Sequence, residues 1–94
     1  MTEKERLKIQ NAALNIDGIR YQQWKLVEEC GELLNAIAKV KTKAANVEEI
    51  ITELADVSII IEQLAYFYGL DDFKKERDRK LIRLKERLQE KLKP

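Results

Sequence analysis

The chain has 94 residues, of which 45% are hydrophobic and 37% are charged, and its 18 basic and 17 acidic side chains leave a net charge of +1. This balance excludes a chain-wide field for holding nucleic acid or an anionic membrane, so neither is an expected partner. Because Cys30 is the single cysteine, an internal disulfide is excluded. The absence of histidine excludes Ser/His and Cys/His catalysis and argues against zinc sites and Glu-x-x-His di-iron sites.

The first expected helix opens at Thr2 and Glu5, which have the spacing of a capping box. The turn-forming residues NIDG at 15–18 predict its end. A second helix is expected to begin near Ile19 and to run to Val40, before the segment KTKAAN loosens the apolar pattern.

The third expected helix begins at Asn46, which has Glu49 three residues later in a capping-box-like start, and ends at Gly69. Asp71 or Asp72 then caps a fourth, amphipathic helix. Its apolar residues are Leu70, Phe73, Leu81, Leu84, Leu88 and Leu92.

The third expected helix is apolar over most of its circumference, which one partner helix cannot cover. The residues that form this wide face are Ile50, Ile51, Leu54, Ala55, Val57, Ile59, Ile60, Ile61, Leu64 and Tyr68. We therefore predict an all-α fold over a single domain, residues 1–94, built on a helical hairpin as a bundle of about four helices and completed by homo-oligomerisation.

The start of the chain and its apolar runs predict a cytoplasmic protein. The opening MTEKERLK does not have the pattern of a signal peptide. No apolar run reaches the roughly 18 residues that a membrane-spanning helix needs. We therefore expect no membrane partner.

Two acidic pairs stand within the apolar helices. Glu29 and Glu32 are three residues apart, as are Glu53 and Asp56, so each pair projects from one face of its helix. If the loop is centred near residue 43, an antiparallel hairpin brings the pairs within about one turn, roughly 5 Å, of each other. The four carboxylates are therefore expected to converge.

Clustered carboxylates repel one another and lose hydration unless a cation neutralises them. Oxygen ligands in a chain without histidine favour Mg²⁺, with Mn²⁺ as an alternative. Such a centre suits phosphate substrates, because metal ions neutralise phosphate oxygens and help to generate hydroxide for in-line attack. The competing interpretation is that glutamate is simply common on solvated helix faces.

The motif EECGE at 28–32, followed after twenty residues by ELAD at 53–56, resembles the Glu-Glu-x-x-Glu and Glu-x-x-Asp signature of the MazG-like all-α nucleoside triphosphate pyrophosphohydrolases. The resemblance covers about residues 20–85. It implies Mg²⁺-dependent cleavage of a nucleoside triphosphate between the α and β phosphates, giving the monophosphate and pyrophosphate. It also implies dimers or tetramers, with nucleotide pockets near subunit contacts.

The resemblance implies a role for each acid. Glu29, Glu32, Glu53 and Asp56 would be the Mg²⁺ ligands. Glu28 projects about 100° away from Glu29, which leaves it to orient water or a ligand. These five acids are the expected catalytic residues.

Substrate contacts are expected outside the acidic motif. The resemblance places phosphate binding on the last helix, where Lys80 and Arg83 are the candidates, and Trp24 lies one turn before Glu28, where an indole can stack on a base. The alternatives are exposed bases on a charged helix and a core or interface tryptophan. Further candidates for reading base edges are Asn15, Gln22 and Gln23.

Two other functions compete with the enzyme. A non-enzymatic helical adaptor or oligomerisation protein would explain the broad apolar face of the third helix and the zipper-like last helix. Nucleic-acid binding is suggested by the ten basic residues after residue 73, but aromatic residues do not interleave with them. The two pairs of acids favour the enzyme.

Overall fold

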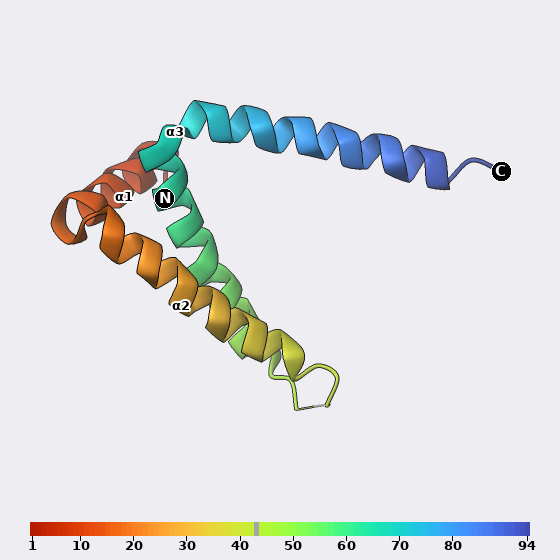
Figure 1. Ribbon diagram of the computed structural model, residues 1–94, viewed down its shortest axis with the longest axis horizontal. Helices are drawn as coiled ribbons and strands as arrows, with labels where there is room; N and C mark the ends of the chain where they lie inside the picture. Colours follow the sequence, from red (N-terminus) through yellow and green to blue (C-terminus); the bar gives the residue numbers. More distant parts are fainter. Residues whose placement is uncertain (43) are drawn as a thin grey trace.

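The computed structural model describes residues 1–42 and 44–94, and this part of the chain forms three α-helices and no strand (Figure 1). The helices are α1 (Glu3–Asp17), α2 (Ile19–Ala38) and α3 (Val47–Lys91). The predicted all-α class is confirmed. The loop centre predicted at residue 43 lies outside the described residues.

The start of α1 has the predicted capping box. The Glu5 backbone N–H donates to the Thr2 hydroxyl at 3.1 Å, and the Thr2 backbone N–H donates to the Glu5 carboxylate at 3.3 Å. The helix continues to Asp17, two residues beyond the start of the expected turn, because only Gly18 breaks it. Gly18 has φ +83°, a conformation that glycine adopts without steric cost.

The second helix and residues 47–68 of α3 lie side by side as an antiparallel hairpin (Figure 1). Half of the expected capping box forms at the start of α3, where the Glu49 N–H donates to the Asn46 side chain at 3.2 Å. The Glu49 carboxylate instead accepts from Lys39 at 3.2 Å. This ion pair joins the two helices at the loop end of the hairpin.

The expected count of about four helices is not confirmed, because α3 continues across a bend at Gly69, the residue at which the third helix was expected to end. Gly69 has φ 135° and ψ 95°, and helical geometry resumes at once. The expected caps Asp71 and Asp72 therefore lie inside α3. Residues 70–91, called the C-terminal arm below, point away from the hairpin (Figure 1).

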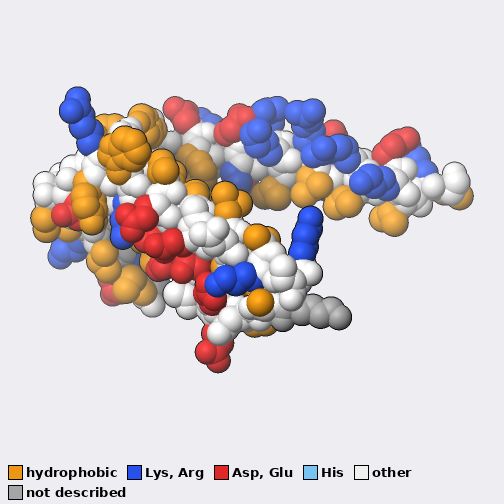
Figure 2. Space-filling model, turned by 60° about the horizontal axis from the view of Figure 1, so that its bottom comes forward, with side chains coloured by type: hydrophobic (Ala, Val, Ile, Leu, Met, Phe, Trp, Pro, Cys, Tyr) orange, Lys and Arg blue, Asp and Glu red, His pale blue; other side chains and the backbone are white. Residues whose placement is uncertain are grey.

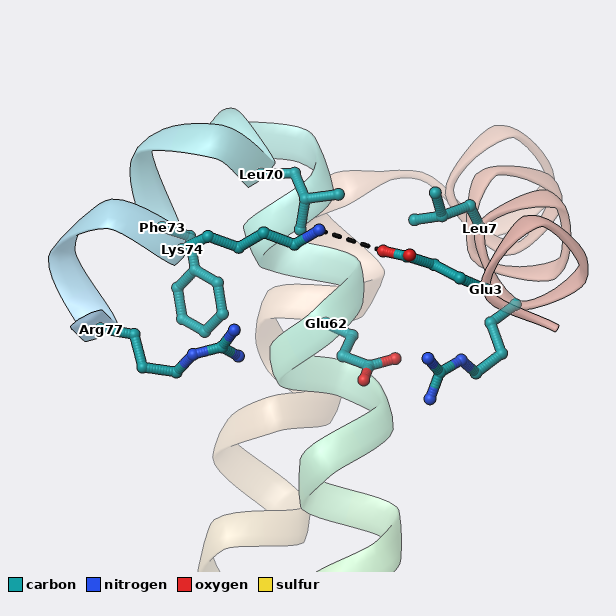
Figure 3. Close-up of a pocket in the computed structure, with 8 residues that line it drawn as sticks. Glu3, Leu7, Glu62, Leu70, Phe73, Lys74 and Arg77 are labelled. Atoms are coloured by element: carbon teal, nitrogen blue, oxygen red, sulfur yellow. Dashed lines mark hydrogen bonds and ion pairs between the residues drawn. The ribbon is translucent and has the colours of Figure 1, made fainter. Parts of the chain in front are cut away.

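The first turns of the C-terminal arm rest against α1. The Lys74 ammonium lies 3.0 Å from the Glu3 carboxylate (Figure 3). The same ammonium holds the pKa of Glu3 below its ordinary value. Beside this ion pair, the Arg77 guanidinium stacks over the Phe73 ring, 5.3 Å from its centre. Of these two contacts, the Lys74–Glu3 ion pair links the arm to α1.

The folded chain is extended and buries little apolar surface. Its radius of gyration is 16.6 Å, where a compact domain of this length has about 12 Å. Its accessible surface is 7822 Å², where a compact monomer of 11.0 kDa exposes about 5,600 Å². The buried apolar residues are Ala36, Val57, Ile60 and Ala65.

The C-terminal arm carries part of the exposed apolar surface. Figure 2 shows basic side chains along one side of the arm and a row of hydrophobic side chains along the other. On the arm, Leu81, Leu84 and Leu88 are 55%, 43% and 50% exposed. In the described part of the chain, every helix is too short or too polar to cross a lipid bilayer.

Candidate metal centre

Three of the expected ligands come together between the helices of the hairpin. Glu29 projects from α2, and Glu53 and Asp56 project from α3. One carboxylate oxygen from each of the three lies within 4.8 Å of the others. Two oxygens bound to one Mg²⁺ lie at most about 4.2 Å apart, so the spacing of these three oxygens is close to that of a shared coordination sphere.

The cluster contains buried oxygens without hydrogen bonds. Glu29 is 7% exposed, although it is ionisable. The Oε2 atoms of Glu29 and Glu53 are both buried and have no hydrogen-bond partner in the described part of the chain. An unpaired buried carboxylate oxygen costs free energy that a bound cation offsets. The residues therefore fit a hard divalent cation that prefers oxygen ligands.

The fourth expected ligand, Glu32, borders this cluster but is exposed and is not one of the three convergent groups. The pKa of Glu32 is raised, chiefly by the negative charge of Glu29 and then by partial loss of hydration and the charge of Glu53. A bound cation would relieve this repulsion. Glu28 is exposed on α2, and its carboxylate lies 3.7 Å from the Lys25 ammonium.

An open groove of about 420 Å³, called the cavity below, adjoins the cluster, with Glu29 and Asp56 in its wall. Gln22 and Gln63 also line it, and these two polar side chains are only 4% and 7% exposed. The Gln63 Oε1 atom is buried without a hydrogen-bond partner among the described residues. The cavity thus presents acids beside amides, and at least one of the amides has an unused acceptor.

One basic side chain of the described chain, Lys25, lines this cavity. Its ammonium lies 3.1 Å from Oε1 of Glu29. The hydrogen bond to Glu29 and the charges of both neighbouring glutamates raise the pKa of Lys25. Lys25 is therefore the cation that partly neutralises the cluster in the protein on its own.

The substrate residues expected from the sequence lie elsewhere. Lys80 and Arg83 are exposed on the C-terminal arm, and Lys80 lines a separate shallow groove with Leu81 and Leu84. Trp24 is 73% exposed on α2. Within a single chain, none of these three residues lines the cavity beside the acids.

The polar candidates for base recognition have three different surroundings. Gln22 reaches the cavity. Gln23 instead donates to the Tyr68 hydroxyl at 2.5 Å, and Asn15 is exposed on α1.

Sequence reasoning missed Lys25 and Gln63, although the spacing carries a signal for both. Lys25 precedes Glu29 by four residues, and Gln63 follows Asp56 by seven. Both spacings place the two side chains on one face of a helix. Further residues of a metal site can therefore be sought among the polar residues on the same helix face as an expected acidic ligand.

Comparison of the chain with protein-family models, with curated proteins and with solved structures finds no match. The assignment of function therefore depends on the site itself.

Proposed function

We propose that the protein is a Mg²⁺-dependent nucleoside triphosphate pyrophosphohydrolase of the MazG-like type. The observation that carries the proposal is the cluster of Glu29, Glu53 and Asp56 with its buried, unpaired oxygens. Such a cluster is costly for a small protein to bury unless a cation neutralises it. The motif spacing that resembles this family supplies the acids of the cluster.

The three convergent acids would hold Mg²⁺ or Mn²⁺, with Glu32 as the fourth ligand at the exposed border. A bound Mg²⁺ would supply positive charge for phosphate oxygens and favour the ionisation of water. Glu28 is exposed beside these acids and would hold water in place by accepting its hydrogen bonds.

A nucleotide suits the cavity because its lining offers groups for both parts of such a ligand. Metal-bound phosphates would sit beside Glu29, Asp56 and Lys25. The amides of Gln22 and Gln63 provide both donors and acceptors for a base or sugar.

Homo-oligomerisation, as a dimer or a tetramer, is the second part of the proposal. The accessible surface of 7822 Å² exceeds that of a compact monomer by about 2,200 Å², which is enough for a stable subunit interface. In such an assembly, the arm of one subunit would bring Lys80 and Arg83 to the acids of another. Analytical ultracentrifugation tests the assembly, and a monomer at micromolar concentration contradicts it.

The enzymatic proposal is tested with Glu53→Gln and with Glu48→Gln as its control. Glu48 is exposed on the first turn of the same helix. Isothermal titration with Mg²⁺ and release of pyrophosphate from a panel of nucleoside triphosphates are measured for each protein. We expect Glu53→Gln to lose both and Glu48→Gln to keep both. Equal activity in the two variants would remove the cluster from the mechanism.

The exposed leucines of the C-terminal arm favour one other function, that of a helical adaptor without catalysis. An adaptor needs no metal, so it predicts that the wild-type protein gives no heat of Mg²⁺ binding and releases no pyrophosphate. The same titration therefore separates the two functions.

A further inference from the structure

Lys25 differs from the other basic residues because its ammonium contacts the acids of the site in the folded chain on its own. Its ammonium is 3.1 Å from Glu29 and 3.7 Å from Glu28. The Lys25 side chain is 35% exposed, whereas that of Glu29 is 9% exposed. The ion pair therefore has one end inside the cluster and one end in the cavity.

This pair leaves the acids incompletely neutralised. Lys25 bonds to one oxygen of Glu29, while Oε2 of Glu29 and Oε2 of Glu53 remain buried without partners. A divalent cation held by the same glutamate would stand within a few ångströms of the ammonium, and the two positive charges would repel each other. The ammonium must then move away from Glu29, and its four-carbon stem allows this.

The cavity gives the displaced ammonium a place to go. Lys25 lines it together with the metal-binding acids Glu29 and Asp56 and with Gln22 and Gln63. A polyphosphate bound to the metal brings negative oxygens into that same space. A lysine ammonium is a common partner for phosphate because it is a compact charge with three donors.

We propose that Lys25 is a phosphate-binding residue that also acts as a built-in counter-ion: it neutralises Glu29 in the free protein, and the metal displaces it onto the substrate phosphates. This inference rests on the proposed function. It predicts that one substitution changes two affinities in opposite directions. Loss of the ammonium should strengthen metal binding, because a competitor of the metal is removed, and weaken phosphate binding, because a partner of the phosphates is removed.

The test uses Lys25→Gln and Lys25→Arg, with Lys39→Gln as a matched control. Lys39 is the C-terminal cap of α2, and its ammonium also pairs with a glutamate of the hairpin, Glu49, at 3.2 Å. Isothermal titration measures the Kd for Mg²⁺ alone and then, at saturating Mg²⁺, the Kd for inorganic tripolyphosphate, which has no base or sugar. Circular dichroism confirms that each variant is folded.

We expect Lys25→Gln to bind Mg²⁺ roughly threefold or more tightly, because a nearby positive charge is lost. We expect the same variant to bind tripolyphosphate about tenfold more weakly, because a charge-assisted hydrogen bond is lost. Lys25→Arg keeps the charge and should stay within about twofold of the wild type in both measurements. Lys39→Gln should change neither.

Two results overturn the inference separately from the proposed function. If the wild type binds Mg²⁺ but Lys25→Gln leaves tripolyphosphate affinity unchanged, Lys25 does not bind phosphate. If Lys25→Gln weakens the binding of both ligands, Lys25 supports the site only structurally. A wild-type protein that binds no Mg²⁺ overturns the metal centre itself, and the role of Lys25 with it.

Discussion

The hairpin and the C-terminal arm are both helical, but among the described residues the hairpin buries polar side chains and the arm does not. The buried polar residues are Gln22, Glu29 and Gln63 of the hairpin and Gln10 of α1, which packs on it. Residues 75–94, by contrast, are all exposed. Pairs such as Glu76–Arg79 and Glu90–Lys93 link neighbouring turns of the arm, and such pairs support a helix locally.

This difference separates the chemistry of the two regions. Buried acids are poorly hydrated, so they gain from a bound cation. The interleaved charges of the arm remain solvated and interact weakly. The same residue types therefore form a candidate metal site in the hairpin and a solvent-exposed charged surface on the arm.

The largest expected effect compares one substitution in each region. Asp56→Asn removes a carboxylate from the cluster, and we expect pyrophosphate release to fall by at least about a hundredfold, as when metal sites lose a ligand or its support. Asp78→Asn makes the same chemical change on the exposed arm, and its rate should match the wild type. A coupled pyrophosphate assay at saturating Mg²⁺ measures both. Comparable losses at the two positions would erase the distinction.

The second effect is on stability and compares a buried apolar residue with an exposed one. Ile60 is 5% exposed, so Ile60→Ala should lower the free energy of unfolding by about 2–4 kcal/mol at any protein concentration. Leu84 is 43% exposed, so Leu84→Ala should cost under about 0.5 kcal/mol in dilute protein.

Concentration separates the two variants further. If the arm contributes to the subunit interface, the cost of Leu84→Ala grows as the protein is concentrated, because association stabilises the wild type more. Urea unfolding at two concentrations measures this. A concentration-independent loss at Leu84 would argue against an interface on the arm.

The third effect concerns the bend between the two regions. Alanine at Gly69 would have to adopt φ near +135°, so Gly69→Ala should cost about 1–2 kcal/mol. Gly31→Ala is the control, because a Cβ at this helical position in α2 meets no atom within 4 Å. That variant should gain about 0.5–1 kcal/mol. Chemical denaturation measures both changes, and equal signs would contradict the conformational requirement at the bend.

The smallest effect is the dependence of stability on pH in the absence of Mg²⁺. The raised pKa of Glu32 means that the folded chain binds this proton more tightly than the unfolded chain. Glu32 therefore adds stability as pH falls through its raised pKa toward 4.5. Glu3 has a lowered pKa, so its stabilising pair with Lys74 is present above 4.5 and is lost as pH falls through the lowered value.

Substitution separates these two contributions. Glu32→Gln should remove the gain in folding stability on acidification, and Glu3→Gln should remove the loss of folding stability. Thermal unfolding near neutral pH and near pH 3.5 measures the difference for each variant, with added Mg²⁺ as a further comparison for Glu32. An unchanged pH profile in Glu32→Gln would mean that this carboxylate does not sense the charge of the cluster.

The helix starts and the acidic pairs were predictable because they depend on residues close in sequence. The cap at Thr2 needs only Glu5 three residues away, and the convergence of Glu29 with Glu53 and Asp56 follows from helical spacing and one short loop. The class of fold follows from the same local patterns.

The course of the chain after Gly69 was not predictable in this way. A glycine can end a helix or bend it, and the outcome depends on distant contacts such as that between Lys74 and Glu3. The neighbours of the acids were also missed, because the burial of Gln63 and the position of Lys25 depend on how the helices pack. The local sequence pattern determines which residues share a helix face. The packing of the helices determines which of these faces lines a cavity.

The bend at Gly69 also has an evolutionary consequence. One nucleotide change in a glycine codon yields alanine, a strong helix former that disfavours this dihedral angle. A straight α3 of 45 residues would be about 67 Å long, longer than the 53 Å extent of the whole folded chain. A single codon thus biases the chain between a bent and a straight α3, at a position outside the residues of the acidic cluster.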